Sequence, residues 1–206
     1  MTPETSKRLI LASASPRRKE ILKKLGLKFE TIPSKVDETI EENIPPDEAV
    51  RLLSLRKARD VANKLNTPAI VIGSDTTVVV DAVSLGKPVD YDDAYSMLKQ
   101  LNNRSHRVIT GLTIIDTSDG KTLTDSVSSE VYFKNLSEND IEHYIKTGEP
   151  MDKAGAYAIQ GVASTFITHI NGCYNNIVGL PVFKLSEMLK LFQIDILAIN
   201  TAKDRL

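Results

Sequence analysis

Two serines and two arginines gather where a short apolar run gives way to a helical pattern. Ser13 and Ser15 follow the run 8–12, and Arg17 and Arg18 come directly after them in the first helical turn. Capping explains Ser15, but cations at the N-terminus of a helix oppose the helix dipole. A bound anion reverses that penalty, because hydroxyl, guanidinium and backbone N–H groups then converge on the same oxygens. A capped helix with solvated arginines is the alternative, yet the pattern favours a phosphate site.

An acidic residue interrupts one of the most apolar stretches of the chain. Asp75 lies in 73–77, the polar middle of the run AIVIGSDTTVVV at 69–80. An unpaired buried carboxylate is unfavourable, so one interpretation is a tight turn between two strands, capped by Asp75. The other is a carboxylate at the mouth of a cleft, where it holds a metal or accepts a proton. Open α/β sheets bind ligands at such strand ends.

Three further charged residues complete a set that fits a polyphosphate. Lys57 interrupts the apolar face of a helical pattern, Lys87 lies in a Gly-Lys-Pro loop, and Glu38 ends the motif Val-Asp-Glu. Each alone is typical of a solvated surface. Together with the arginines, the hydroxyls and Asp75, they supply the groups that bind a polyphosphate and a divalent metal.

The segment 152–161, DKAGAYAIQG, surrounds Tyr157 and Gln160 with alanine and glycine. Small side chains allow a planar ligand to approach the backbone closely, which favours a binding role for this segment. A strand bounded by glycines is an equally good interpretation of the same pattern.

The periodicity of apolar residues predicts the elements that position these groups. The order of these elements predicts an α/β fold, with a long mixed twisted sheet flanked by helices. A turn at 118–120 joins two long strands as a hairpin, whereas the loop 171–180 and the tail after 195 carry no predicted element. We expect strands at 8–12, 29–33, 69–80 (interrupted), 105–115, 121–134 and 162–170, and helices at 16–25, 46–65, 91–101, 137–148 and from 181 onward.

The composition predicts one globular domain over residues 1–206. The 206 residues are 41% hydrophobic, have a formal net charge of −1, and contain no repeat or linker. A charge so close to zero argues against nucleic acid or a membrane surface as a partner. No run approaches the roughly 18 apolar residues of a membrane span. The lone Cys173 forms no disulfide within the chain and the three histidines lack metal-ligand spacing, which together favour a cytoplasmic protein without structural zinc.

The chain resembles the Maf family of nucleoside triphosphate pyrophosphatases. The resemblance implies hydrolysis between the α and β phosphates, an ITPase-like fold with two lobes and a cleft, and often a homodimer. Minor departures include Asn102-Asn103, where the family usually has Ser-Gly, and the tail 198–206 has no assigned role. The motifs follow the family's order across 8–192: SASPRR at 13–18, VDE at 36–38, KA at 57–58, GSDT at 73–76, GKP at 86–88, HRVITG at 106–111, the segment 152–161 and NNIVGLP at 175–181.

The resemblance and the charge argument together give each residue an expected role. The resemblance implies that Asp75 accepts a proton and that Arg17, Thr76 and Gln160 are associated with substrate choice. We expect Glu38 and Asp75 to hold Mg²⁺ or Mn²⁺, which neutralises charge and lowers the pKa of a bound water. The expected catalytic set is Asp75, Lys57, Lys87 and Glu38, and the expected substrate-binding set is Ser13, Ser15, Arg17, Arg18, Thr76 and Gln160.

Gln160 favours a pyrimidine base. Its carboxamide offers one acceptor and one donor, which match the N3–H and a carbonyl of uracil or thymine. The family branch that acts on methylated guanine nucleotides carries Glu at this position. We therefore expect dTTP, UTP and 5-modified uridine triphosphates as substrates, in a role that cleans the nucleotide pool. Two alternatives stay open: a pyrophosphatase for purine or methylated-guanine triphosphates, and a non-enzymatic regulator of septum formation that binds nucleotides or nucleic acid.

Overall fold

A mixed β-sheet forms the centre of the computed structural model, which describes residues 7–41 and 43–201. The strands follow the spatial order β2-β1-β3-β5-β6-β7, and β4 pairs with β3 beside this path. β1 runs parallel to β2 and β3, whereas the pairs β3–β4, β3–β5, β5–β6 and β6–β7 are antiparallel, so the predicted mixed sheet is confirmed. The strands are β1 Arg8–Leu11, β2 Glu30–Thr31, β3 Ala69–Val80, β4 Val83–Leu85, β5 Ser105–Asp116, β6 Thr122–Phe133 and β7 Ile167–Asn171.

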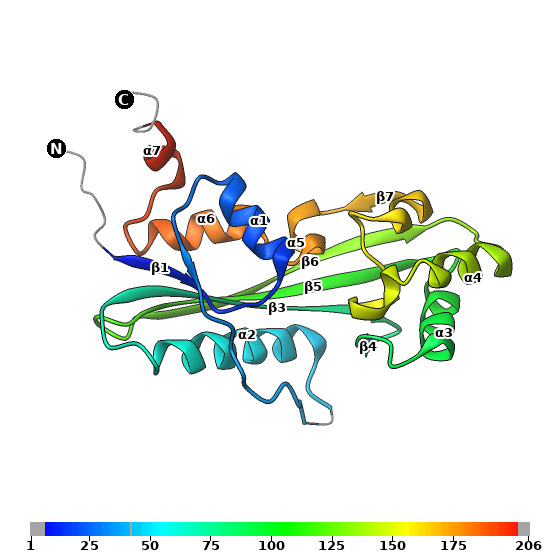
Figure 1. Cartoon of the computed structure of the whole chain (residues 1–206), viewed down its shortest axis with the longest axis horizontal. Coiled ribbons are helices and arrows are strands. Elements are labelled where there is room, and N and C mark those ends of the chain that lie inside the picture. Colours follow the sequence, from blue (N-terminus) through cyan, green and yellow to red (C-terminus); the bar gives the residue numbers. More distant parts are fainter. Residues whose placement is uncertain (1–6, 42, 202–206) are drawn as a thin grey trace.

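Helices cover both faces of the sheet (Figure 1). α2 lies along one face against β3 and β5, while α1, α5 and α6 lie on the opposite face. α3 and α4 pack together at the end of the sheet that carries β4 and β7. In the part of the chain that the structure describes, no helix combines the length and apolar composition needed to cross a bilayer. The helices are α1 Pro16–Lys24, α2 Pro46–Ala62, α3 Tyr91–Leu101, α4 Glu138–Lys146, α5 Tyr174–Val178, α6 Val182–Lys190 and α7 Ile196–Thr201.

Two groups of buried side chains give the molecule its two lobes. One group packs α3 and α4 against the sheet and includes Leu98 and Ile141. The other packs α1 and α6 against the sheet and includes Leu22, Ile72 and Leu189. Strands β3 and β5 contribute residues to both groups, so these long strands join the two lobes.

Two glycines allow α2 to lie directly on the sheet. A Cβ atom at Gly73 in β3 would lie 2.3 Å from one backbone oxygen of α2, and a Cβ at Gly111 in β5 would lie 2.1 Å from another. Both separations are far below van der Waals contact, so any larger residue would push the helix away. This close approach brings Lys57 of α2 into contact with Asp75 of β3.

Strand β3 is continuous, and the predicted interruption at 73–77 is therefore wrong. Asp75 pairs with Gly111 of β5 in an unbroken antiparallel register. The polar side chains of β3 find partners in other elements, among them Lys57 for Asp75 and the backbone oxygen of Gly179 for Ser74. Because these partners satisfy the buried polar groups, the strand does not need to turn toward solvent.

The segment 152–161 forms short turns, so its interpretation as a strand is wrong. Two 3₁₀ helices, Glu149–Asp152 and Ala154–Ala156, occupy its first half. Gly155 adopts a φ of +66°, and a Cβ there would lie 2.8 Å from Val78. A left-handed residue pressed against the sheet in this way cannot continue an extended strand.

Four smaller differences concern one strand boundary and three short elements that were not predicted. β7 begins at Ile167 instead of 162, because 162–166 form another 3₁₀ helix. The short strand β4 was not expected, and the predicted loop 171–180 contains α5. The tail after 195 contains α7, which ends at Thr201.

Candidate active site

A cavity of about 960 Å³ lies between the two lobes, where the resemblance predicts a cleft. Its walls come from the start of α1, the middle of β3, the loop after β4, the segment 152–160 and the turn after α5. Part of the loop between β2 and α2 closes one side. All ten residues that the sequence analysis selected line this one cavity.

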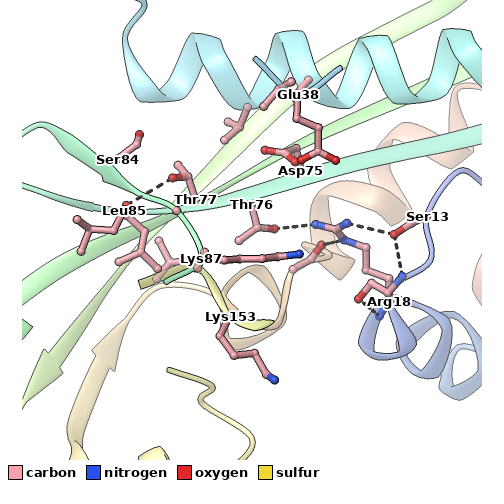
Figure 2. Close-up of a pocket in the computed structure, with 18 of the residues that line it drawn as sticks. Ser13, Arg18, Glu38, Asp75, Thr76, Thr77, Ser84, Leu85, Lys87 and Lys153 are labelled. Atoms are coloured by element: carbon pink, nitrogen blue, oxygen red, sulfur yellow. Dashed lines mark hydrogen bonds between the residues drawn. The ribbon is translucent and has the colours of Figure 1, made fainter. Parts of the chain in front are cut away.

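A lysine between two carboxylates marks one wall of the cavity. The Nζ atom of Lys57 lies 2.6 Å from Oδ1 of Asp75 and 2.9 Å from Oε1 of Glu38. The side chains of Lys57 and Asp75 are only 10% and 12% exposed, whereas that of Glu38 is 63% exposed. Figure 2 shows Glu38 and Asp75 close together beneath α2. The buried pair therefore forms the fixed part of this wall, and Glu38 forms its open rim.

The loop that carries Glu38 is held against α2. The guanidinium of Arg56 donates to the backbone oxygen of Thr39 at 2.7 Å, and the backbone N–H of Lys35 donates to Asp60 at 3.0 Å. Both anchors belong to α2, the same helix that carries Lys57. The loop and the helix thus present Glu38 and Lys57 together.

Arg18 is oriented by three protein oxygens. It donates to the backbone oxygen of Gly179 at 2.7 Å, to Oγ of Ser13 at 3.2 Å and to Oγ1 of Thr76 at 3.0 Å (Figure 2). A guanidinium has five N–H donors, so two remain for a ligand in the cavity. Burial lowers the pKa of Arg18 and the charge of Asp75 opposes that shift. The side chain nevertheless stays protonated at neutral pH.

A chain of hydroxyl groups holds Arg18 in this orientation. Thr110 of β5 donates to the backbone oxygen of Asn176 at 2.9 Å, so its own oxygen accepts from Thr76 at 2.9 Å. Thr76 in turn accepts from Arg18. The hydroxyl hydrogen of Thr76 is thus committed to Thr110, and Thr76 meets a ligand only as an acceptor or through Arg18. The side-chain amide of Asn176 is itself fixed by two hydrogen bonds that it donates at 2.9 Å.

Ser15 caps α1 as the sequence predicts. Its Oγ accepts from the backbone N–H of Arg18 at 3.5 Å, and its own N–H donates to Oγ of Ser13 at 3.2 Å. The two serines, the helix N-terminus and Arg18 therefore present donors at one end of the cavity, as expected for an anion site.

The side chain of Lys87 has no hydrogen bond or ion pair within the described part of the chain. Its side chain is exposed and extends along the cavity below Thr76, whereas Lys153 points away (Figure 2). Lys153 pairs with Asp152, and Lys153 and Arg17 both lower the pKa of that carboxyl. Lys87 is therefore available to a ligand, while Lys153 is already neutralised.

Gln160 and Tyr157 also line the cavity. Gln160 is exposed, and among residues 7–41 and 43–201 no group bonds to its side chain. Tyr157 is buried, with its hydroxyl 2.7 Å from Nε2 of His106. Burial, followed by the charge of Arg104, lowers the pKa of His106 to about 4, so this ring is neutral at pH 7. The hydrogen bond with His106 thus holds Tyr157 in place, whereas the side chain of Gln160 is free to contact a ligand.

The residues present fit a metal that arrives with phosphate, not a cage made by protein alone. Within the described residues, no group of three or more His, Cys, Asp or Glu side chains is arranged to bind a metal. Glu38 and Asp75 nevertheless share one cation already, the ammonium group of Lys57. Two carboxylates completed by substrate phosphates are the usual protein contribution to a magnesium site.

Sequence reasoning gave no role to several residues that build this site. Thr110, Asn176 and His106 lie inside the motifs that carry the resemblance, but a threonine in a strand or an asparagine near a turn is unremarkable in pattern. Glu149, which contacts the Gln160 segment, lies outside those motifs. A buried polar residue is informative only once its partners are known.

Curated proteins and solved structures are similar to this chain. A dTTP/UTP pyrophosphatase of Desulforamulus reducens is 51% identical over 188 residues, which are 91% of this chain and 98% of the relative. A protein of the same name from Alkaliphilus metalliredigens is 52% identical over 191 residues, 92% of this chain and 99% of the relative. The structure of the Staphylococcus aureus Ham1 protein is 17% identical, with a TM-score of 0.44, and the match covers 89% of this chain and 98% of that chain.

The family model described as Maf-like protein matches residues 8–192. This range contains the whole of the cavity lining, from Ala12 to Gly179. The curated relatives are about 50% identical over nine-tenths of the chain. The chain belongs to the Maf family.

Proposed function

We propose that this protein hydrolyses nucleoside triphosphates between the α and β phosphates, with dTTP and UTP as its substrates. The observation that carries the proposal is the buried Lys57–Asp75 pair, which lines the same cavity as the donors of Ser13 and Arg18. The pair supplies a carboxylate beside a cation, and the donors supply a phosphate site. Relatives at about 50% identity that are named dTTP/UTP pyrophosphatase support the same reaction.

Asp75 is the proton acceptor in this proposal. Lys57 bonds to Oδ1, and no described residue donates a hydrogen bond to Oδ2, so this oxygen is available to a water. The water oxygen attacks the α-phosphorus and its proton passes to Asp75. The bridging oxygen then leaves with pyrophosphate, and the nucleoside monophosphate remains.

Cations reduce the repulsion between the attacking oxygen and the charged phosphates. Arg18 and Lys57 are fixed by their hydrogen bonds, whereas the exposed Lys87 adjusts to the bound phosphate chain. Glu38 and Asp75 would hold Mg²⁺ or Mn²⁺ through substrate phosphates. When bound, the metal supplies positive charge at the phosphates and makes a bound water more acidic.

Gln160 selects the base in this proposal. Its exposed carboxamide lines the cavity and presents one donor and one acceptor to the N3–H and a carbonyl of uracil or thymine. Arg17 also lines the cavity, and its charge acts on Asp152. A cytoplasmic location and a homodimer stay predictions, and the dimer is checked by light scattering of the purified protein.

One panel of substrates tests the proposed function. Purified protein with Mg²⁺ is given dTTP, UTP, dCTP, CTP, ATP, GTP and 7-methyl-GTP separately, and pyrophosphate and orthophosphate are measured. We expect pyrophosphate from dTTP and UTP in preference to the others, and none after EDTA treatment. Preference for guanine nucleotides would overturn the assigned base, and release of orthophosphate alone would overturn the assigned bond.

A further inference from the structure

Glu149 holds the segment that carries Gln160. Its Oε2 accepts from the backbone N–H of Val162 at 2.9 Å, and its Oε1 accepts from the N–H of Ala163 at 3.4 Å. The same Oε1 accepts from the hydroxyl of Tyr144 at 2.9 Å. One half-buried carboxylate thus binds two consecutive amides of the segment and one side chain of α4.

The residue between Gln160 and these amides packs directly on the carboxylate. A Cβ atom at Gly161 would lie 2.2 Å from Oε1 of Glu149, so only glycine fits there without displacing the carboxylate. Hydrogen bonds on one side and this contact on the other fix the backbone at 161–163. We call Glu149 and its hydrogen bonds to Val162, Ala163 and Tyr144 the Glu149 clamp. Tyr144 is buried with its ring against Phe166, so this clamp is anchored in the lobe formed by α3 and α4.

Gln160 depends on this anchoring because its own side chain has no partner in the described part of the chain. The backbone on its other side is held by a turn, in which Gly161 N–H donates to the backbone oxygen of Ala158 at 3.1 Å. A bidentate contact between a carboxamide and a base edge tolerates displacements of only about 0.5 Å. The position of Gln160 therefore follows the position of the clamped backbone.

We propose that Glu149 is a positioning residue for base selection, acting through the backbone of 161–163 on Gln160. This inference rests on the proposed function, in which Gln160 meets the base. Glu149 touches neither the phosphate end of the cavity nor the Lys57–Asp75 pair; it is absent from the cavity lining in the described chain. Its effect should consequently appear in base discrimination and in KM, with little change in kcat.

The variant Glu149→Gln tests the proposal with minimal change of shape. The carboxamide replaces one acceptor oxygen by an N–H₂ group, which cannot accept from a backbone amide. We expect KM for dTTP and UTP to rise about tenfold, with kcat within about twofold, because a backbone N–H of the segment loses its acceptor and the segment is less well fixed. The UTP-to-GTP ratio of kcat/KM should fall by a similar factor. Glu142→Gln is the matched control, since Glu142 lies on α4 and its one ion pair among the described residues is with Lys146, so it should behave as wild type.

A base-free inhibitor separates base positioning from damage to the whole site. The inhibition constant of inorganic tripolyphosphate should be the same in wild type and Glu149→Gln, because the phosphate end of the cavity is untouched. Amide hydrogen exchange at Val162 and Ala163 should be faster in Glu149→Gln and unchanged in Glu142→Gln. The double variant Glu149→Gln with Gln160→Ala should lose no more discrimination than Gln160→Ala alone.

The outcomes separate the inference from the function beneath it. If wild type releases pyrophosphate from dTTP and UTP, and Glu149→Gln keeps wild-type discrimination despite faster exchange, the positioning role is overturned while the function stands. Equal weakening of tripolyphosphate and nucleotide binding would also overturn it, because that pattern indicates general destabilisation. If wild type releases no pyrophosphate from any nucleotide, the proposed function is overturned, and with it the role of Glu149 in base selection. Amide exchange at 162–163 would then test only the hydrogen bonds that Glu149 accepts.

Discussion

The two oxygens of Asp75 have different surroundings. Oδ1 is bonded to Lys57, while Oδ2 receives no hydrogen bond from the described residues. Removing the charge of Asp75 therefore acts on both the ion pair and the proposed proton acceptor. The isosteric change to asparagine keeps an oxygen for Lys57 and removes only the basic function and the charge.

Asp75→Asn should abolish most turnover while the protein stays folded. We expect kcat to fall by a factor of about 100 or more, the usual contribution of a general base. Pyrophosphate release measures the rate, and thermal unfolding checks the fold. Asp116→Asn is the control, because Asp116 is also a buried carboxylate paired with a lysine, Lys7 at 2.5 Å, but lies outside the cavity lining. Near-wild-type turnover in Asp75→Asn would remove Asp75 from the proposed role.

Gln160→Glu should change the base that the protein accepts. A carboxylate offers acceptors only, so it repels the carbonyl of uracil and suits the N1–H and amino group of guanine. We expect kcat/KM for UTP to fall about 100-fold, because a carbonyl of uracil loses its donor and faces a carboxylate, and the ratio to GTP to fall with it. Competition between UTP and GTP in one reaction measures the ratio. Unchanged rates for both nucleotides would contradict edge matching by Gln160.

Single residues were predictable where their type conflicts with their surroundings. Arg17 and Arg18 at a helix N-terminus, and Asp75 inside an apolar run, are each unfavourable without a partner, so each points to a site. Thr110 and Glu149 create no such conflict in the sequence. Thr110 matters through hydrogen bonds to residues at least 34 positions away, whereas Glu149 bonds to a turn whose shape no local pattern predicts.

At the scale of elements, a series of hydrogen bonds that begins at Arg18 joins four elements. The hydroxyl chain runs from α1 through β3 and β5 to α5, so the orientation of Arg18 depends on packing between elements far apart in the sequence. Thr110 is the central link of this hydroxyl chain and is fully buried.

Thr110→Val should loosen the orientation of Arg18 without changing the shape of β5. We expect KM to rise about tenfold, because Thr76 and Asn176 each lose a buried partner and Arg18 is less well oriented. Thr110→Ser should restore binding, since it keeps the hydroxyl. Thr113→Val is a matched control on the same strand: Thr113 is equally buried and bonds to Ser54 and Thr124, away from the cavity. An equal rise of KM in both valine variants would contradict the role given to Thr110.

The sequence predicted the regular elements well and the irregular ones poorly. The helix 91–101 and the hairpin around 118–120 match the structure because apolar periodicity and turn residues specify them locally. The interruption of β3 was wrong because the partners of Ser74 and Asp75 come from α2 and the turn at Gly179, which local pattern does not show. The 3₁₀ helices at 149–166 were missed because packing against Val78 and Glu149 determines them.

At the scale of the whole molecule, the cavity and the stability of one lobe share a side-chain cluster. Tyr157 faces the cavity and also packs with His106 and Phe133 inside the lobe formed by α3 and α4. Protonation of His106 would place a charge in this cluster. The acid stability of the protein is therefore linked to the wall of the cavity near Gln160.

The lowered pKa of His106 determines the direction in which the free energy of unfolding changes with pH. Burial lowers it from 6.5 to about 4, so between these values the unfolded chain binds a proton that the folded chain does not. The free energy of unfolding therefore rises with pH across this window and is constant with respect to His106 above it. Between pH 6.5 and 5 the change should be about 2 kcal/mol.

Urea unfolding at a series of pH values checks this slope. His106→Phe should be less stable at neutral pH, because the hydroxyl of Tyr157 loses its partner, yet its stability should change little between pH 5 and 6.5. His143→Gln is the control, since His143 is exposed on α4, and it should keep the wild-type slope. Carboxylates titrate mostly below pH 5, so between pH 5 and 6.5 they contribute a similar background to all three proteins. An unchanged slope in His106→Phe would show that another group binds the proton, and the cavity wall would then be independent of acid unfolding.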